Sequence, residues 1–270
     1  MSLMFQQCFN LEEVPLFNTA AVTTMQAMFN SCYRLKSVPE FNTANVTNMN
    51  SMLANCYSLK SVPQFNTSKV TDMGSMFQNC YSLRSVPLFN TANVTSMSAT
   101  FNSCTSLQSV PKFDTTKLTN IQQLFYGCSS LINIPPLNTA NVTQMQSMFV
   151  SCSKLKTIPA LNTVKVTNPQ FMFQNCPLLT EVPPLNFNAV TVAANFVSVF
   201  SGCTSLSRMS ANGFNYSFSV ANCKLSANAL NEIYTNLPTV VGQTITVTGN
   251  YGTSSDDPTI ATGKGWTVTG

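Results

Sequence analysis

The sequence predicts an α/β solenoid of about nine stacked coils, each with a short parallel strand and a short helix, closed by a C-terminal α+β cap. Two observations predict it: cysteine recurs every 24 residues, and each interval repeats the same order of apolar residues, proline, asparagine and threonine. A fixed period of this length is typical of repeat proteins, in which one unit is too small to fold alone. The cysteines are Cys8, Cys32, Cys56, Cys80, Cys104, Cys128, Cys152 and Cys176, with Cys203 following after 27 residues.

The first half of each repeat predicts a short strand. With the cysteine as position 0, leucine stands at +3, valine or isoleucine at +6, proline at +7 and phenylalanine or leucine at +9. In the unit that starts at Cys32 these apolar residues are Leu35, Val38 and Phe41. Proline cannot donate to a ladder, so Pro39 keeps the predicted strand short.

The second half of each repeat predicts a helix of about two turns. Its apolar residues fall at i, i+3, i+6 and i+7, which is the stripe of an amphipathic helix. In the same unit they are Val46, Met49, Met52 and Leu53. Thr43 is placed to cap the helix N-terminus. The residue before each cysteine is Asn, Ser, Gly or Gln, which suits the left-handed conformation found at helix ends.

Polar residues also recur in columns. Asn or Asp at +10 and threonine at +11 and +15 predict side-chain hydrogen bonds between coils. Position +13 alternates Asn and Lys, which predicts a solvated face with the lysines about 10 Å apart. This column contains Asn45, Lys69, Asn93, Lys117, Asn141 and Lys165.

Composition excludes several classes of function. The 270 residues contain 13 Lys and Arg, 9 Asp and Glu and no histidine, so only 8% are charged. Without histidine, Ser-His-Asp catalysis and histidine-containing zinc sites are excluded. We therefore expect no enzyme, no catalytic residue, no metal site and no cofactor. The net charge of +4 is dispersed and no apolar run is long enough to span a bilayer, so we expect neither nucleic-acid binding nor membrane insertion.

The cysteines allow two interpretations. Stacked coils would place neighbouring cysteine Cα atoms about 5 Å apart, within reach of a disulfide. The side chains would, however, point inward in parallel, which favours buried free thiols that act as small apolar fillers. We expect the thiols to be free.

The repeat resembles that of the BspA-like leucine-rich-repeat surface proteins, here in a 24-residue variant. Residues 65–77 match its pattern nearly position by position, with the sequence Phe-Asn-Thr-Ser-Lys-Val-Thr-Asp-Met-Gly-Ser-Met-Phe. The likeness covers residues 4 to about 206, although this sequence has Val-Pro and two fewer residues in the strand region. The resemblance implies a right-handed leucine-rich-repeat-like solenoid on bacterial or phage surfaces, used for attachment and recognition rather than catalysis.

Residues 1–209 are predicted to form the solenoid and residues 210–270 a capping unit. Within the latter we expect a helix from Ser226 to Pro238, a strand over 244–248, a helical turn over 257–262 and a strand over 266–268. Residues 260–268 also resemble the closing unit of repeat proteins in phage tails and bacterial surface layers. The N-terminal coil has no comparable cap and no signal peptide, which predicts either a fragment of a longer chain or self-association through that open coil.

The columns that vary between repeats supply the candidate binding site. Aromatic residues at +1 and basic residues at +4 coincide in three consecutive coils, and such pairs suit acidic or sulfated sugars. The alternative is a structural corner in which lysine stems cover tyrosines. The candidate residues are Tyr33, Lys36, Tyr57, Lys60, Tyr81 and Arg84.

The leading functional hypothesis is a non-catalytic recognition or adhesion module. It would bind a cell-surface glycan or protein partner as part of a bacterial surface protein or a phage tail structure, and it would therefore lie outside the cell, on a cell surface or a virion. The alternative is a purely structural spacer rod with no ligand of its own.

Overall fold

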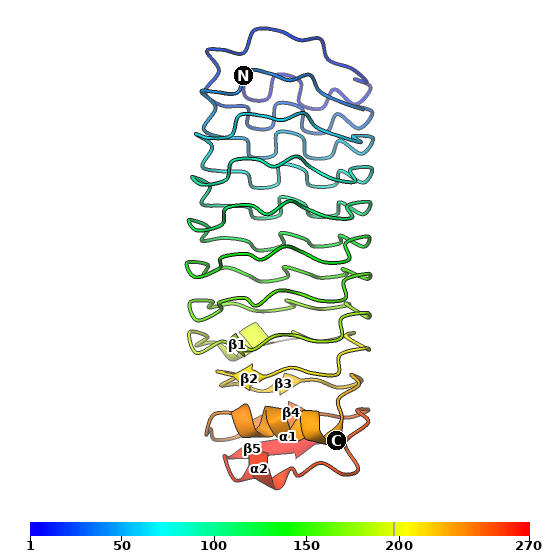
Figure 1. Cartoon of the computed structure of the whole chain (residues 1–270), viewed down its shortest axis with the longest axis vertical. Helices are drawn as coiled ribbons and strands as arrows, with labels where there is room; N and C mark the ends of the chain where they lie inside the picture. Colours follow the sequence, from blue (N-terminus) through cyan, green and yellow to red (C-terminus); the bar gives the residue numbers. More distant parts are fainter. Residues whose placement is uncertain (197) are drawn as a thin grey trace.

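The computed structural model describes residues 1–196 and 198–270. It shows a straight stack of coils, with the chain running from the N-terminal coils at the top of Figure 1 to the C-terminal region at the bottom. Neighbouring coils are joined in parallel at position +16. The bridges run from Thr24 to Asn48 and onward through Asp72, Ser96, Asn120 and Gln144 to Asn168, always 24 residues apart. One apolar core extends from Met25 to Trp266 without interruption. The solenoid architecture is therefore present, and the division at residue 209 stays a prediction.

The predicted two-turn helix is wrong in these coils. The segment before each cysteine forms successive tight turns, and its odd-numbered residues donate their backbone N–H to the adjacent coil. Examples are Met25 N to Asn48 O at 3.0 Å and Phe29 N to Met52 O at 2.9 Å. The even-numbered Met28 instead donates to Met25 O at 3.1 Å within its own coil. The segment thus alternates between local turns and bonds to its neighbour.

Left-handed backbone at every fourth residue makes the turns and prevents a helix. Ala27 has a φ of 49° and Ser31 a φ of 64°, and the equivalent residues of the following coils share this sign. A residue with φ near +60° at the third position of a four-residue turn interrupts the α-helical ladder. The expectation that the residue before each cysteine adopts this conformation is confirmed, but it ends a turn rather than a helix.

Thr43 also differs from its predicted role. It is buried, with 1% of its surface exposed, and its Oγ1 donates to Asn66 O of the next coil at 2.9 Å. The threonines at +11 are thus bonds between coils instead of helix caps. The predicted strand over Leu35 to Phe41 is also wrong. Burial there recurs at every third residue, at Leu35, Val38 and Phe41, instead of alternating as in a strand, and residues 37–41 make no backbone hydrogen bond to another coil among the described residues.

Two buried columns fill the interior. Phenylalanines at +21 stack almost in parallel from coil to coil, as between Phe101 and Phe125 at 5.8 Å and 4°. The cysteines from Cys32 to Cys203 each donate from Sγ to a backbone carbonyl of the preceding coil, as from Cys104 to Phe77 O at 3.1 Å. All ten cysteines are free thiols and nine are buried, with Cys8 the exposed exception. The expected buried, free thiols are confirmed for those nine.

Regular helices and strands are concentrated after residue 184. β1 spans Leu185–Asn186 and pairs with β2 at Ala211–Asn212, and the 3-10 helix η1 spans Ala193–Phe196. β3 at Phe218–Ser219, β4 at Gln243–Thr246 and β5 at Trp266–Thr269 form a parallel three-stranded sheet. α1 spans Ala227–Asn236 and α2 spans Thr259–Thr262. The helix predicted from Ser226 is present, as is the final strand.

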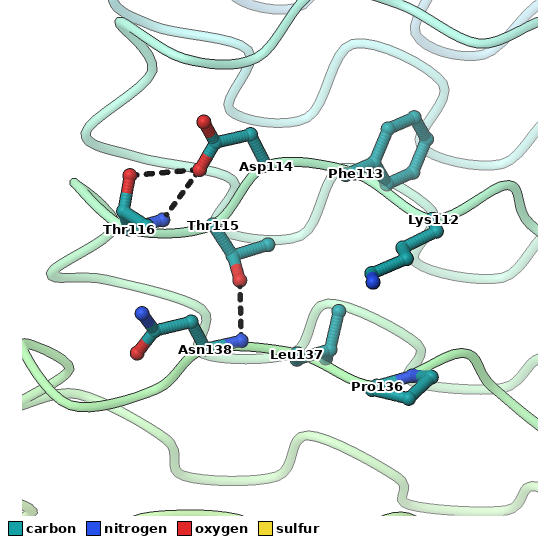
Figure 2. A pocket seen from close by; sticks show the side chains of 8 residues that line it. All are labelled: Lys112, Phe113, Asp114, Thr115, Thr116, Pro136, Leu137 and Asn138. Atoms are coloured by element: carbon teal, nitrogen blue, oxygen red, sulfur yellow. Dashed lines mark hydrogen bonds between the residues drawn. The ribbon is translucent and has the colours of Figure 1, made fainter.

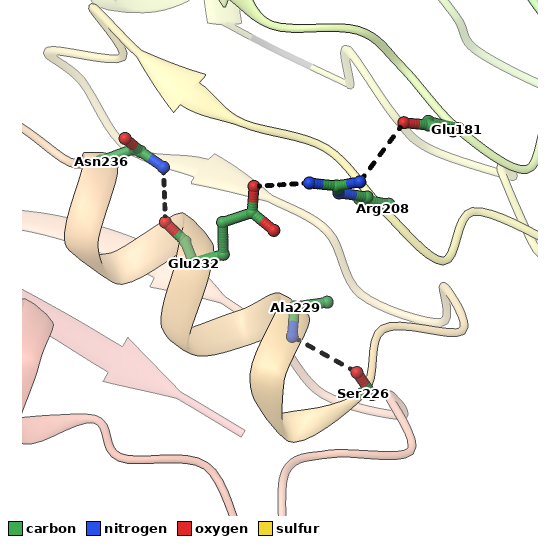
Figure 3. A network of polar contacts seen from close by, with 6 residues as sticks. All are labelled: Glu181, Arg208, Ser226, Ala229, Glu232 and Asn236. Carbon is green, nitrogen blue, oxygen red and sulfur yellow. Dashed lines mark hydrogen bonds and ion pairs between the residues drawn. The ribbon is translucent and has the colours of Figure 1, made fainter.

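α1 is held at both ends. Its N-cap Ser226 accepts from Ala229 N at 3.3 Å, and the Lys264 ammonium donates to the last carbonyls, including Leu237 O at 3.0 Å. Arg208 lies between Glu181 and the α1 residue Glu232, at 4.0 Å and 3.4 Å, and so links the last coils to the helix (Figure 3). Among the described residues, no helix is long and apolar enough to cross a membrane.

Candidate functional site

The predicted aromatic column forms, and its rings stack on one another. Tyr33 and Tyr57 lie with their ring centroids 4.6 Å apart and their planes within 2°, and Tyr57 and Tyr81 follow at 4.9 Å and 24°. On the N-terminal side of the column, the Phe9 ring stacks on Tyr33 with the ring centroids 4.9 Å apart. Burial between its neighbours raises the pKa of the Tyr57 hydroxyl.

This stacking changes what the tyrosines can offer a ligand. The faces of Tyr33 and Tyr57 are covered by other rings, so only their edges and hydroxyls are accessible. Tyr81 ends the column: the residue at +1 in the next coil is Thr105, which is too small to cover its ring. Its side chain is 41% exposed. Among the described residues, the outer face of Tyr81 is therefore the one tyrosine face of this column that no other ring covers.

The three cations do not behave alike. Lys36 donates to Glu12 of the preceding coil at 2.6 Å, and Arg34 lies 3.8 Å from the same carboxylate. The hydrogen bond with Lys36 lowers the pKa of Glu12, and the same contact raises the pKa of Lys36. Lys60 and Arg84 make no ion pair with any residue that the structure describes. Lys36 is thus neutralised, while the other two remain available.

Lys60 and Arg84 converge on one shallow depression. It has a volume of about 360 Å³ and is completed by the hydroxyl-bearing residues Ser82 and Ser106. Ser82 follows Tyr81 directly in the chain. The structure therefore brings Lys60 and Arg84 together in one depression, which is lined by neither Lys36 nor Tyr81. Two cations and two hydroxyls in one depression can hold a sulfate, phosphate or carboxylate group.

The alternating Asn and Lys column is structural. Lys69 Nζ donates to Asn45 Oδ1 at 2.8 Å, and Lys117 and Lys165 make the same bond to the asparagine one coil earlier. The asparagine amide nitrogens donate in turn to backbone carbonyls, as from Asn45 to Ala20 O at 3.0 Å. Each lysine is held by its neighbour, which agrees with the solvated face predicted for this column.

A second hollowed face was missed at the sequence level. It lies at positions +8 to +12 of five consecutive coils, from Glu40 to Asn138. Its signal in the sequence is the variable +8 column beside an otherwise constant +10 column, which holds asparagine in seven copies and aspartate only at Asp114.

Burial keeps the thiols of the core cysteines in their protonated form. Burial raises the pKa of Cys32 to about 11 and that of Cys223 to about 12, and it raises the pKa of Cys80 well above its usual value. A thiol in its protonated form is a poor nucleophile and a poor metal ligand.

Solved structures that are similar to this chain at low identity include those of three leucine-rich proteins. A leucine-rich repeat protein from Bacteroides ovatus is 18% identical, with 91% of this chain and 81% of that chain covered and a TM-score of 0.31. A leucine-rich cell surface protein from Faecalibacterium prausnitzii is 18% identical, with 76% and 61% covered and a TM-score of 0.35. A T. pallidum leucine-rich repeat protein is 16% identical, with 79% and 72% covered and a TM-score of 0.27.

No curated protein matches the sequence. One protein family does match it, in two overlapping stretches over residues 1–110 and 95–214, which together span more than half of the chain. These stretches contain the 24-residue repeats described above. The chain therefore belongs to the family described as "Mycoplasma protein of unknown function, DUF285".

Proposed function

We propose that this protein is a non-catalytic surface recognition module that binds acidic carbohydrate at the end of its tyrosine column. The observation that carries the proposal is the depression formed by Lys60, Arg84, Ser82 and Ser106, in which Ser82 directly follows Tyr81, the last ring of the tyrosine column. An aromatic face packs against the C–H side of a sugar ring, while unpaired cations bind its acidic group. Placement outside the cell, on a bacterial surface or in a phage tail, is part of the same proposal, as is membership of the BspA-like group.

The test is a binding screen against sulfated and uronic-acid polysaccharides, with heparin, chondroitin sulfate and alginate as probes. We expect micromolar binding that weakens steeply with added salt, because the contacts are exposed charges. The double variant Tyr81→Ala with Arg84→Gln should lose at least tenfold in affinity. Tyr57→Ala with Lys60→Ala should also lose affinity, because it opens the stack and removes the second cation.

Lys156→Gln is the matched control. Lys156 occupies the same +4 column but belongs to a coil with Ser153 rather than tyrosine at +1. The variant removes the same charge without touching the proposed site, so its affinity should stay within about twofold of wild type. An equal loss in Lys156→Gln would reduce the binding to non-specific charge attraction.

A spacer rod is the second candidate function. It is favoured by the unbroken core from Met25 to Trp266, which gives the molecule one continuous interior along its length. If no acidic probe binds, or if both double variants bind the probes with wild-type affinity, the carbohydrate site is rejected and the spacer is supported.

A further inference from the structure

The hollowed face at positions +8 to +12 is one continuous channel. Three adjoining depressions share residues: the first and second share Leu88 and Asn90, and the second and third share Lys112 and Asp114. Burial alternates across this segment, so that Asn42 is exposed between the buried Phe41 and Thr43. The exposed +10 residues therefore form the floor of a channel that runs along the rod, which we call the asparagine channel.

The channel exists because no backbone hydrogen-bond ladder joins neighbouring coils at these positions. Residues 85–89 and 109–113 make no backbone hydrogen bond to another coil among the described residues. Proline at +7 has no N–H to donate, so a ladder cannot run through this stretch. Below it, the buried +11 threonines hold the coils together, as between Thr91 Oγ1 and Asp114 O at 2.7 Å. Above them no backbone ladder forms, and the side chain of Gln64 crosses to the next coil by donating from Nε2 to Leu88 O at 2.9 Å.

The asparagines present a row of hydrogen-bond donors. Each +10 asparagine accepts the backbone N–H two residues later through Oδ1, as Asn66 does from Ser68 at 3.1 Å and Asn90 from Ala92 at 3.1 Å. Because an acceptor is needed on that side, the amide orientation is fixed and Nδ2 faces away from the turn. The Nδ2 groups of Asn42, Asn66, Asn90 and Asn138 make no hydrogen bond among the described residues. They recur once per coil, about 4.8 Å apart.

Asp114 replaces one of these donors with an acceptor. Its Oδ1 accepts from Thr116 N at 3.0 Å and Thr116 Oγ1 at 2.7 Å, and its second oxygen accepts no hydrogen bond from the described residues (Figure 2). These hydrogen bonds lower the pKa of Asp114, so the group is ionised at neutral pH. Lys112 and Pro136 line the same depression, which has a volume of about 540 Å³.

The charge of the channel selects against a charged polymer. Charges of both signs line the channel, the carboxylates of Glu40 and Asp114 and the ammonium of Lys112, so it offers no uniform field that would hold a polyanion or a polycation along its length. A sugar hydroxyl can accept from Nδ2 and also donate to the free oxygen of Asp114. The exposed side chain of Leu88 and the ring of Pro136 add apolar contact.

We propose that the asparagine channel binds an uncharged, extended polysaccharide that lies along the rod with about one sugar per coil. Its hydroxyl oxygens accept from Asn42, Asn66, Asn90 and Asn138, and a hydroxyl donates to Asp114. The site lies on different columns from the tyrosine strip and takes a different class of sugar, so it goes beyond the function proposed above.

The test uses the fact that the chain itself tolerates aspartate at +10. Asn66→Asp with Asn90→Asp keeps both turns, as Asp114 shows, but removes two donors. Binding is measured by affinity electrophoresis and calorimetry with cello-, chito- and laminari-oligosaccharides and with mannan. We expect wild type to bind at least one of these probes and the double variant to bind it at least tenfold more weakly. Asp114→Asn should weaken the same interaction about threefold or more.

Asn162→Asp is the matched control, because Asn162 makes the same turn with Val164 at 3.2 Å but lies outside the channel. It adds one negative charge where the double variant adds two, and it should leave affinity within about twofold. Tyr81→Ala with Arg84→Gln should also bind the neutral probe normally, which separates this site from the acidic one. The proposal is overturned if no neutral probe binds or if the double variant binds as wild type does. An array of extended peptides is tested in parallel, and the proposal is also overturned if the channel variants weaken only peptide binding.

Discussion

In the coils between Cys32 and Cys176, the segment before each cysteine donates alternate backbone N–H groups to the next coil, whereas α1 near the C-terminus closes its own hydrogen bonds, as from Leu230 N to Ser226 O at 2.9 Å. Both segments carry an amphipathic apolar pattern. The difference shows that the position of a segment in the stack decides whether it forms an α-helix or turns bonded to the next coil. An α-helix with side chains is about 10–12 Å wide, while hydrogen-bonded strands lie about 4.8 Å apart.

Eight consecutive helices would therefore force one side of the rod to fan out. Turns bonded directly to the next coil keep both sides at the same spacing, and the stack stays straight in Figure 1. At the C-terminal end only α1 and α2 follow one another, so little fanning is needed. The repeat coils consequently depend on their neighbours, and α1 depends on its own capping groups.

Removing an aromatic ring from the rod should have the largest effect. Phe101 is buried between Phe77 at 5.7 Å and Phe125 at 5.8 Å. We expect Phe101→Ala to cost about 3–5 kcal/mol in the free energy of unfolding. Phe101→Leu should cost less than about 1.5 kcal/mol, because Leu53 already fills this column in another coil.

The measurement also tests whether the two regions unfold together. Trp266 is the sole tryptophan and lies in β5, so its fluorescence reports on the C-terminal region during guanidinium denaturation. Far-UV circular dichroism reports on the whole chain. Because one core connects the regions, both signals should shift together in Phe101→Ala. A tryptophan transition that stays at its wild-type midpoint would instead support a separate unit after residue 209.

The next largest effect on stability should come from replacing a glycine with positive φ, and its size should differ between the C-terminal region and the repeat coils. Gly265 has a φ of 84°, and a Cβ there would lie 1.9 Å from Val240 O, so Gly265→Ala should cost at least about 2 kcal/mol. Gly127 has a φ of 68°, but its nearest neighbour would be Ser103 Oγ at 3.3 Å. Since Ser103 and Ser151 adopt this conformation at the same position, Gly127→Ala should cost only about 1 kcal/mol. Equal costs in urea denaturation would contradict this account.

A hydroxyl between coils should count for slightly less. Thr43→Val keeps the shape of the side chain but removes the bond from Oγ1 to Asn66 O, and we expect a loss of about 1–2 kcal/mol. Thr43→Ser should recover most of it. If Thr43 acted as a helix cap instead, serine would equal or exceed threonine, because serine is the stronger capping residue. Chemical denaturation of the three proteins decides between the two roles.

The sequence was sufficient for the period, the buried columns and α1, because each depends on side chains that must face inward or on a local cap such as Ser226. It was insufficient for the turns, since Val46, Met49 and Met52 have a spacing that suits a helix and a chain of turns equally. The preference for Ser, Asn and Gly before each cysteine indicated left-handed backbone. Because helix ends show the same preference, it could not distinguish the end of a helix from the end of a turn. For the candidate site, the columns identified Tyr81, Lys60 and Arg84, whereas ring stacking and the pairing of Lys36 with Glu12 depend on contacts between coils.

The smallest expected effect decides between turn and helix by its sign. Ser147 has a φ of 57° and donates its N–H to Gln170 O at 2.8 Å. In a turn, glycine relieves a left-handed strain of about 1–2 kcal/mol at a conformational cost of about 0.5–1 kcal/mol, so Ser147→Gly should stabilise slightly. Ser147→Ala retains the strain and should differ little from wild type. In a helix the order reverses, with alanine the most stable and glycine the least. Thermal denaturation of the three proteins therefore contradicts the turn if Ser147→Ala melts highest.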